Sequence, residues 1–157
     1  MTKETGKKVL LIGFGNPARE DDGIGPAVAE IVENLQIEGV TVDSDYQLTV
    51  EDSAAAAEHD IVIFVDASIQ GEGPFTFEKV PPRLEESFSS HSVEPEMVIG
   101  LAEHLFRAKT EAYILGIRGY SFEMFTETMT AKAVENMGKA VDFLIPLLKK
   151  YTSRGKL

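Results

Sequence analysis

The sequence contains no cysteine and no tryptophan, and none of its hydrophobic runs approaches the roughly 20 residues of a membrane-spanning helix. Without cysteine, the chain has no disulfide framework, no thiolate nucleophile and no zinc–thiolate site. The first residues, Met-Thr-Lys-Glu, do not form a signal-peptide pattern. We therefore expect a cytoplasmic protein with no membrane partner.

Positive charge is also scarce. The chain has 15 Lys and Arg against 26 Asp and Glu, which gives a net charge of −11. Nucleic acids and anionic lipids bind basic surfaces, so this excess of acid disfavours both as partners. The composition, 43% hydrophobic and 26% charged, is that of an ordinary globular protein. A chain of 157 residues is most simply one domain spanning residues 1–157.

Short apolar runs alternate with helical patterns along the chain. The patterns predict strands at residues 8–12, 40–43, 61–65, 75–80 and 112–117, and helices at 26–35, 50–58, 95–106 and from Thr130 onward. The runs at 9–12 and 61–65 are continuously apolar, as in strands covered on both faces. We expect a single-domain α/β three-layer sandwich of the phosphorylase/hydrolase type. Its mostly parallel, twisted sheet of about five strands carries helices on both faces, with the first and third strands adjacent.

Proline and the apolar stripes make the helix predictions more specific. Pro26 is expected at the first position of its helix, where a missing N–H costs nothing. Pro146 is expected to kink or end the last helix. The stripe of the helix at 95–106 predicts that Leu105 and Phe106 are buried.

A glycine-rich loop, GFGNPAREDDGIG at residues 13–25, separates the first predicted strand from the first helix. Open α/β sheets bind their ligands in such loops, outside the carboxyl ends of the strands. Gly13, Gly15 and Ala18 fit a relaxed dinucleotide fingerprint. However, the Asn-Pro pair at 16–17 indicates a turn, and the three acids at 20–22 would repel a pyrophosphate. A metal ion or a reacting peptide is the better prediction.

Three side chains are candidates for chemistry. Asp22 lies in this loop, Asp66 follows the apolar run at 61–65, and His91 precedes the helix at 95–106. If the first and third strands are neighbours, Asp22 and Asp66 converge on one crevice. Two carboxylates and an imidazole suit nickel or zinc and leave positions open for another ligand.

Each candidate also has a structural interpretation. Asp22, like its neighbour Asp21, precedes a helix and could complement the helix dipole. Asp66 could be an ordinary turn residue at the end of a strand. His91 lies in a polar segment and could simply be solvated. No Gly-x-Ser-x-Gly motif is present, so a serine hydrolase is not indicated.

Three motifs, in this order and spacing, resemble the maturation endopeptidases of nickel–iron hydrogenases. They are the loop just described, Phe-Val-Asp-Ala at 64–67 and Ser-His-Ser at 90–92. The resemblance implies a twisted sheet between helices and an enzyme that removes the C-terminal extension of a hydrogenase large-subunit precursor after nickel insertion. It places the family's metal-binding positions on Asp22, Asp66 and His91.

The resemblance further implies an aspartic-type or metal-dependent peptidase. Asp22 and Asp66 would be its catalytic carboxylates, and Asn16 and the loop amides would position the peptide. Three protein ligands alone would hold metal weakly, so we expect the substrate to supply the nickel and expect no organic cofactor. The partner is then the large-subunit precursor, and the enzyme itself is expected to be a monomer.

One segment departs from the family pattern. Many members carry an Asp-Gly-Gly-Thr turn after the second strand, where this chain has Asp-Ser-Asp-Tyr-Gln-Leu at 43–48, so the identity of the client hydrogenase does not transfer. Two alternative functions remain open. One is a nickel-dependent maturation chaperone that binds the client without cutting. The other is a peptidyl-tRNA hydrolase-like esterase, because the segment at 9–17 also resembles the opening of those enzymes.

Overall fold

The computed structural model describes residues 6–84 and 93–153. Five strands form one sheet in the order β2-β1-β3-β5-β4. The strands are β1 (Val9–Phe14), β2 (Val40–Asp45), β3 (Ile61–Ser68), β4 (Phe75–Lys79) and β5 (Glu111–Arg118). All neighbouring pairs are parallel except β4 with β5, which is antiparallel. The predicted α/β class, the mostly parallel sheet and the adjacency of the first and third strands are confirmed.

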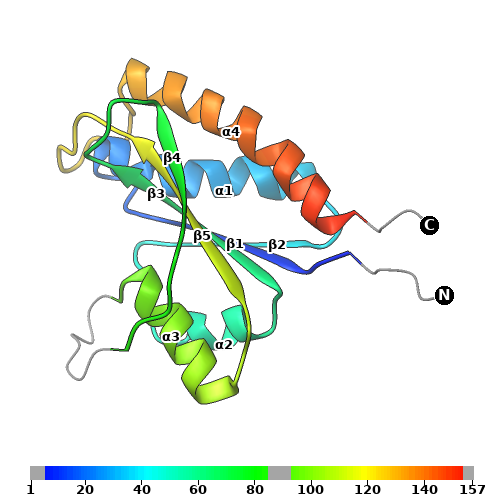
Figure 1. Cartoon of the computed structure of the whole chain (residues 1–157). Helices are drawn as coiled ribbons and strands as arrows, with labels where there is room; N and C mark the ends of the chain where they lie inside the picture. The colour runs from blue at the N-terminus through cyan, green and yellow to red at the C-terminus, as the bar shows by residue number, and fades with distance from the viewer. Residues whose placement is uncertain (1–5, 85–92, 154–157) are drawn as a thin grey trace.

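Helices cover both faces of this sheet (Figure 1). One face carries α1 (Ile24–Leu35) and α4 (Ala131–Thr152), and the other carries α2 (Asp52–Ala57) and α3 (Pro95–Phe106). A 3₁₀ turn, η1 (Glu20–Gly23), precedes α1. None of the described helices is long and apolar enough to cross a membrane.

The burial of β1 and β3 on both faces explains why the molecule has three layers. Residues 9–12 of β1 and 61–65 of β3 alternate between the two core clusters, and all of them are fully buried. The face toward α1 and α4 is built by Val9, Leu11, Ile61, Ile63 and Val65, and the opposite face by Leu10, Ile12, Val62 and Phe64. A strand with apolar side chains on both faces must be covered on both faces, which is what the continuous apolar runs predicted.

The helix ends follow the predictions in part. Thr130 caps α4 as expected, since its Oγ1 accepts a hydrogen bond from the N–H of Ala133 at 3.3 Å. Pro26 is not the first residue of α1, which begins at Ile24. Pro26 still lies in the first turn, where backbone N–H groups have no acceptor within the helix, so its lack of an N–H breaks no helical hydrogen bond. Pro146 does not end α4, because the helix continues to Thr152 and buries Leu148 against the sheet.

The buried stripe of α3 is shorter than predicted. Leu105 and Phe106, in the last turn of the helix, are 60% and 51% exposed. The buried residues lie earlier in α3: Pro95, Met97, Val98, Ile99, Gly100 and Ala102. The helical period was correct, but it could not show how far along the helix the burial extends.

Candidate functional site at the carboxyl ends of the strands

The loop after β1 folds back on itself and places Asp22 against the end of that strand. The Oδ1 atom of Asn16 accepts a hydrogen bond from the N–H of Ala18 at 2.9 Å, which forms the turn that the Asn-Pro pair predicted. Gly15 has a φ of +141°, and a Cβ on it would lie 2.1 Å from the carbonyl oxygen of Asp22. Glycine is therefore required where η1 packs on the strand end.

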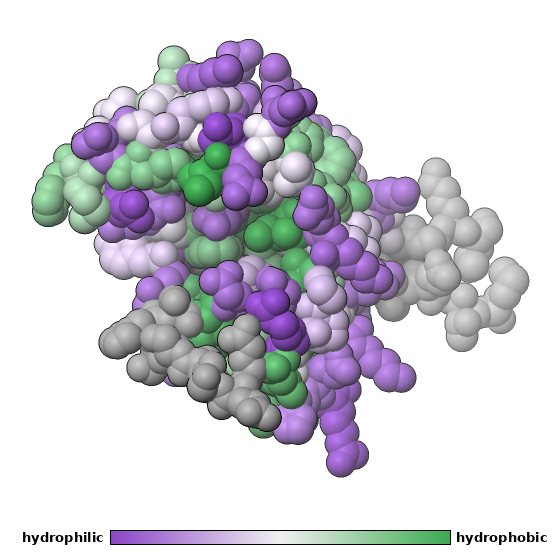
Figure 2. Space-filling model, turned by 60° about the vertical axis from the view of Figure 1, so that its left-hand side comes forward, coloured by the Kyte–Doolittle hydropathy of each residue, from purple (hydrophilic) through white to green (hydrophobic). Residues whose placement is uncertain are grey.

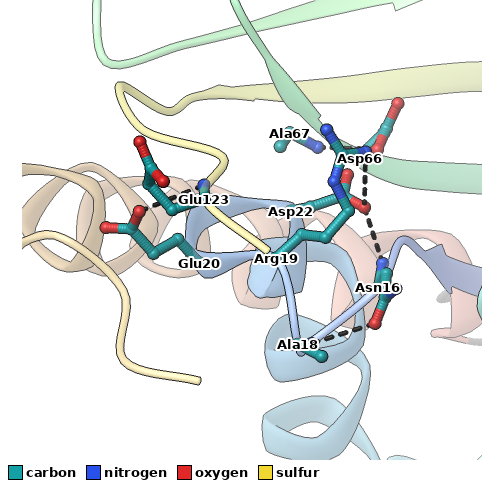
Figure 3. A network of polar contacts seen from close by, with 8 residues as sticks. All are labelled: Asn16, Ala18, Arg19, Glu20, Asp22, Asp66, Ala67 and Glu123. Carbon is teal, nitrogen blue, oxygen red and sulfur yellow. Dashed lines mark hydrogen bonds and ion pairs between the residues drawn. The ribbon is translucent and has the colours of Figure 1, made fainter. Parts of the chain in front are cut away.

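Among the described residues, Asp22 has two polar partners, both from its own loop. Its Oδ2 accepts a hydrogen bond from the N–H of Asn16 at 2.7 Å, and the Nη1 of Arg19 lies 3.9 Å from the same oxygen. The side chain of Asp22 is 22% exposed, so solvent still reaches it. Figure 3 shows Asn16, Arg19 and Asp22 grouped beside Asp66.

Asp66 lies near the carboxyl end of β3, where it pairs with Gly116 of β5. Burial raises the pKa of its carboxyl group to about 7. The hydrogen bond from the N–H of Ala67 opposes this change, and the negative charges of Asp22 and Glu94 add to it. At neutral pH this carboxyl group is therefore partly protonated.

Asp22 and Asp66 thus come together, as the predicted strand order required. The first belongs to the loop that follows β1 and the second to β3, its neighbour in the sheet, and the charge of Asp22 acts on Asp66. His91 lies outside the described residues. Within the described ranges, no group of three His, Cys, Asp or Glu side chains is arranged to hold a metal ion. The described part of the site is a pair of coupled carboxylates.

Two further charged residues at this site were not candidates from the sequence. Arg19 contacts Asp22, and Glu94, just before α3, raises the pKa of Asp66. The spacing of three residues between Arg19 and Asp22 is a signal that could have indicated the first. Nothing local in the sequence indicates that Glu94 lies near the end of β3.

Asp21, in contrast, is a structural residue. It is fully buried and accepts four hydrogen bonds, from the N–H groups of Tyr120, Ser121 and Thr130 and from the hydroxyl of Thr130. Burial alone would raise the pKa of Asp21, but these hydrogen bonds outweigh it and the net pKa lies below the ordinary value. Asp21 therefore fastens the site loop to the segment that connects β5 and α4.

Glu20 reinforces the same junction. Its Oε1 accepts hydrogen bonds from the hydroxyl of Ser121 and the N–H of Glu123, and its own N–H donates to the carbonyl of Thr126 at 2.6 Å. Its φ is +48°, an uncommon conformation for a residue with a side chain. Of the three consecutive acids, two hold the loop and only Asp22 faces Asp66.

The segment that departs from the family pattern lies beside this loop. Ser44, Asp45 and Tyr46 line a pocket of about 210 Å³, together with Gly15, Pro17 and Pro26 of the site loop. Tyr46 is 70% exposed at its rim. A larger pocket of about 720 Å³ lies at the opposite end of β5, near Val80 and Ala112, and neither Asp22 nor Asp66 lines it.

Comparisons with known proteins agree with this fold. Neither a protein-family model nor a curated protein sequence matches the chain. Among solved structures, the [NiFe] hydrogenase maturation protease HycI from Thermococcus kodakarensis is similar with a TM-score of 0.72 and 24% identity, over 92% of this chain and 94% of that one. The hydrogenase maturating endopeptidase HybD from E. coli gives a TM-score of 0.66 and 18% identity, over 91% and 93%. A hydrogenase 2 maturation peptidase from a Thaumarchaeota archaeon gives 0.66 and 20%, over 90% and 98%. The chain therefore has the fold of the nickel–iron hydrogenase maturation proteases.

Proposed function

We propose that this protein is an endopeptidase that removes the C-terminal extension of a nickel–iron hydrogenase large-subunit precursor after nickel has been inserted. The observation that carries the proposal is the coupled pair Asp22 and Asp66, on a fold shared with maturation proteases. The pair lies at the edge of the sheet where open α/β folds bind their ligands. The precursor is then the partner that binds at this edge.

In the proposed reaction, nickel is part of the substrate. Asp22 and Asp66 offer carboxylate oxygens to it, and His91 offers an imidazole nitrogen, a donor set that suits nickel. The part of His91 rests on the sequence, because this residue lies outside the described ranges. A site with so few protein ligands depends on the ligands that the substrate brings, so an immature precursor without nickel would not complete it.

Peptide hydrolysis also requires that a water molecule lose a proton. A carboxyl group whose pKa lies near the working pH accepts and returns protons efficiently, and burial gives Asp66 a pKa of about 7. Asp22 keeps the partners of an ionised carboxylate, the N–H of Asn16 and the guanidinium of Arg19. We therefore assign proton transfer to Asp66 and metal binding chiefly to Asp22, while the cation polarises the scissile carbonyl.

The direct test is to incubate the purified protein with a nickel-loaded, unprocessed large subunit and to follow its intact mass. We expect the precursor to lose the mass of its C-terminal extension. Stable binding of the precursor without mass loss would instead indicate the maturation chaperone. Hydrolysis of peptidyl-tRNA with no effect on the precursor would indicate the esterase, which the net charge of −11 disfavours because tRNA is an anion.

A further inference from the structure

Arg19 is a positively charged side chain that contacts the proposed site. Its Nη1 lies 3.9 Å from the Oδ2 of Asp22, and Figure 3 shows the side chain extending along Asp22 toward Asp66. The negative charges of Asp22 and Glu94 both act on Asp66 at this point. The guanidinium therefore places a positive charge beside Asp22 and Asp66, the two carboxylates that the proposed function assigns to nickel.

The backbone of Arg19 is fixed on both sides. Its N–H donates to the carbonyl of Asn16 at 3.0 Å, and its carbonyl accepts from the N–H of Asp22 at 3.0 Å. Its neighbours in the chain, Ala18 and Glu20, are both hydrogen-bonded to Thr126, at 2.9 and 2.6 Å. The base of the side chain is thus held beside Asp22, whereas the side chain itself is 43% exposed and free to turn away into solvent.

A guanidinium in this position competes with a metal ion. A divalent cation bound to Asp22 would lie about 2 Å from a carboxylate oxygen. The same carboxylate already has the positive charge of Arg19 as its partner. Binding the cation would bring like charges together or would require the ion pair to break, and both lower the affinity.

We propose that Arg19 is a positioning residue that weakens the binding of free divalent cations to the Asp22–Asp66 pair, so that the empty site stays available for the metal that the substrate carries. This inference rests on the proposed function. Substrate-borne nickel, unlike a free ion, brings further protein contacts that can displace the guanidinium from Asp22. The arginine then discriminates between metal in solution and metal in the client.

The test is equilibrium dialysis of untagged, metal-free protein against Ni²⁺, which needs no client. We expect Arg19→Gln to bind Ni²⁺ about tenfold more tightly than wild type, because one positive charge next to the ligand oxygen is removed. Arg19→Lys keeps the charge and should remain close to wild type. Lys139→Gln removes one charge from the exposed pair with Glu135 on α4, and should also leave the affinity unchanged.

A double variant tests whether any gain in Ni²⁺ affinity arises at the Asp22–Asp66 pair. Adding Asp22→Asn to Arg19→Gln should abolish the tighter binding, whereas a gain that persists would place the metal elsewhere and overturn the inference. Equal Ni²⁺ affinity of wild type and Arg19→Gln, including no binding by either, would also overturn it. The proposed function is tested by a different experiment. It fails if the wild-type protein leaves the nickel-loaded precursor uncut, whatever the dialysis shows.

Discussion

At the scale of single residues, Asp66 is a carboxyl group that the fold holds in an unfavourable environment. Burial, together with the nearby charges of Asp22 and Glu94, raises its pKa from the ordinary value of 3.8 to about 7. The folded protein therefore binds this proton more tightly than the unfolded chain. Such a group lowers stability as the pH rises from about 4 to about 7, and its effect is constant above that range.

We accordingly expect Asp66→Asn to stabilise the metal-free protein at high pH. The free energy of unfolding, measured with urea, should exceed that of wild type by on the order of 2–4 kcal/mol at pH 8, and the difference should shrink toward zero near pH 4. Asp142→Asn, at an exposed position on α4, is the matched control and should change little at either pH. If Asp66→Asn is less stable than wild type at pH 8, the ionised Asp66 carboxylate does not destabilise the folded protein, and the prediction is wrong.

Gly25 is a second residue whose identity the fold demands. A Cβ on it would lie 2.3 Å from the carbonyl oxygen of Phe14 and 2.6 Å from that of Val65, so the start of α1 would have to move away from β1 and β3. We expect Gly25→Ala to lower the free energy of unfolding by about 3 kcal/mol.

Gly138 provides the control for that substitution. It lies within α4, and a Cβ on it would have no neighbour within 4 Å. Gly138→Ala should therefore raise the free energy of unfolding by about 0.5–1 kcal/mol, because alanine loses less backbone entropy than glycine in a helix. Urea unfolding of both variants measures the contrast, and an equal effect of the two would contradict the close approach at Gly25.

At the scale of elements, the site depends on a junction between two loops. The loop after β1 is held to the segment between β5 and α4 by Asp21 and Glu20. On the other side of that segment, Asn136 of α4 donates hydrogen bonds to the carbonyl of Arg118 and to the hydroxyl of Tyr120. Helix α4 thus supports the site loop without contributing a side chain to the site.

Asp21 should therefore be important for stability. We expect Asp21→Asn to lower the free energy of unfolding by about 3 kcal/mol at neutral pH, because the amide group would face N–H and O–H donors that now bind a carboxylate. Since the folded-state pKa of Asp21 is depressed, its contribution is present above the unfolded value of 3.8 and is lost as the pH falls below it. The difference from wild type in urea unfolding should thus decrease in acid. A difference that does not depend on pH would mean that the charge of Asp21 is not what holds the loops.

At the scale of the whole molecule, the sheet and its two covered faces could be predicted because apolar runs report burial directly. The meeting of Asp22 and Asp66 followed from the same reasoning, since neighbouring parallel strands end at one edge. A structural role for Asp21 could be predicted, but its partners Tyr120 and Thr130 could not, because they lie 99 and 109 residues away in the sequence. The exposure of Phe106 could not be predicted from helical spacing alone, and α4 continues past Pro146 with Leu144 and Leu148 buried in the core on either side of it.

The central claim is that Asp22 and Asp66 form a peptidase site completed by nickel in the substrate. The most direct measurement is a time course of intact masses for two forms of one large-subunit precursor, nickel-loaded and nickel-free, each incubated with wild type, Asp22→Ala, Asp66→Ala and the control Asp142→Ala. We expect wild type and the control to trim only the nickel-loaded form, and both site variants to trim neither, while all four proteins remain folded. Efficient trimming of the nickel-free precursor by wild type, or normal trimming by either site variant, would contradict the claim.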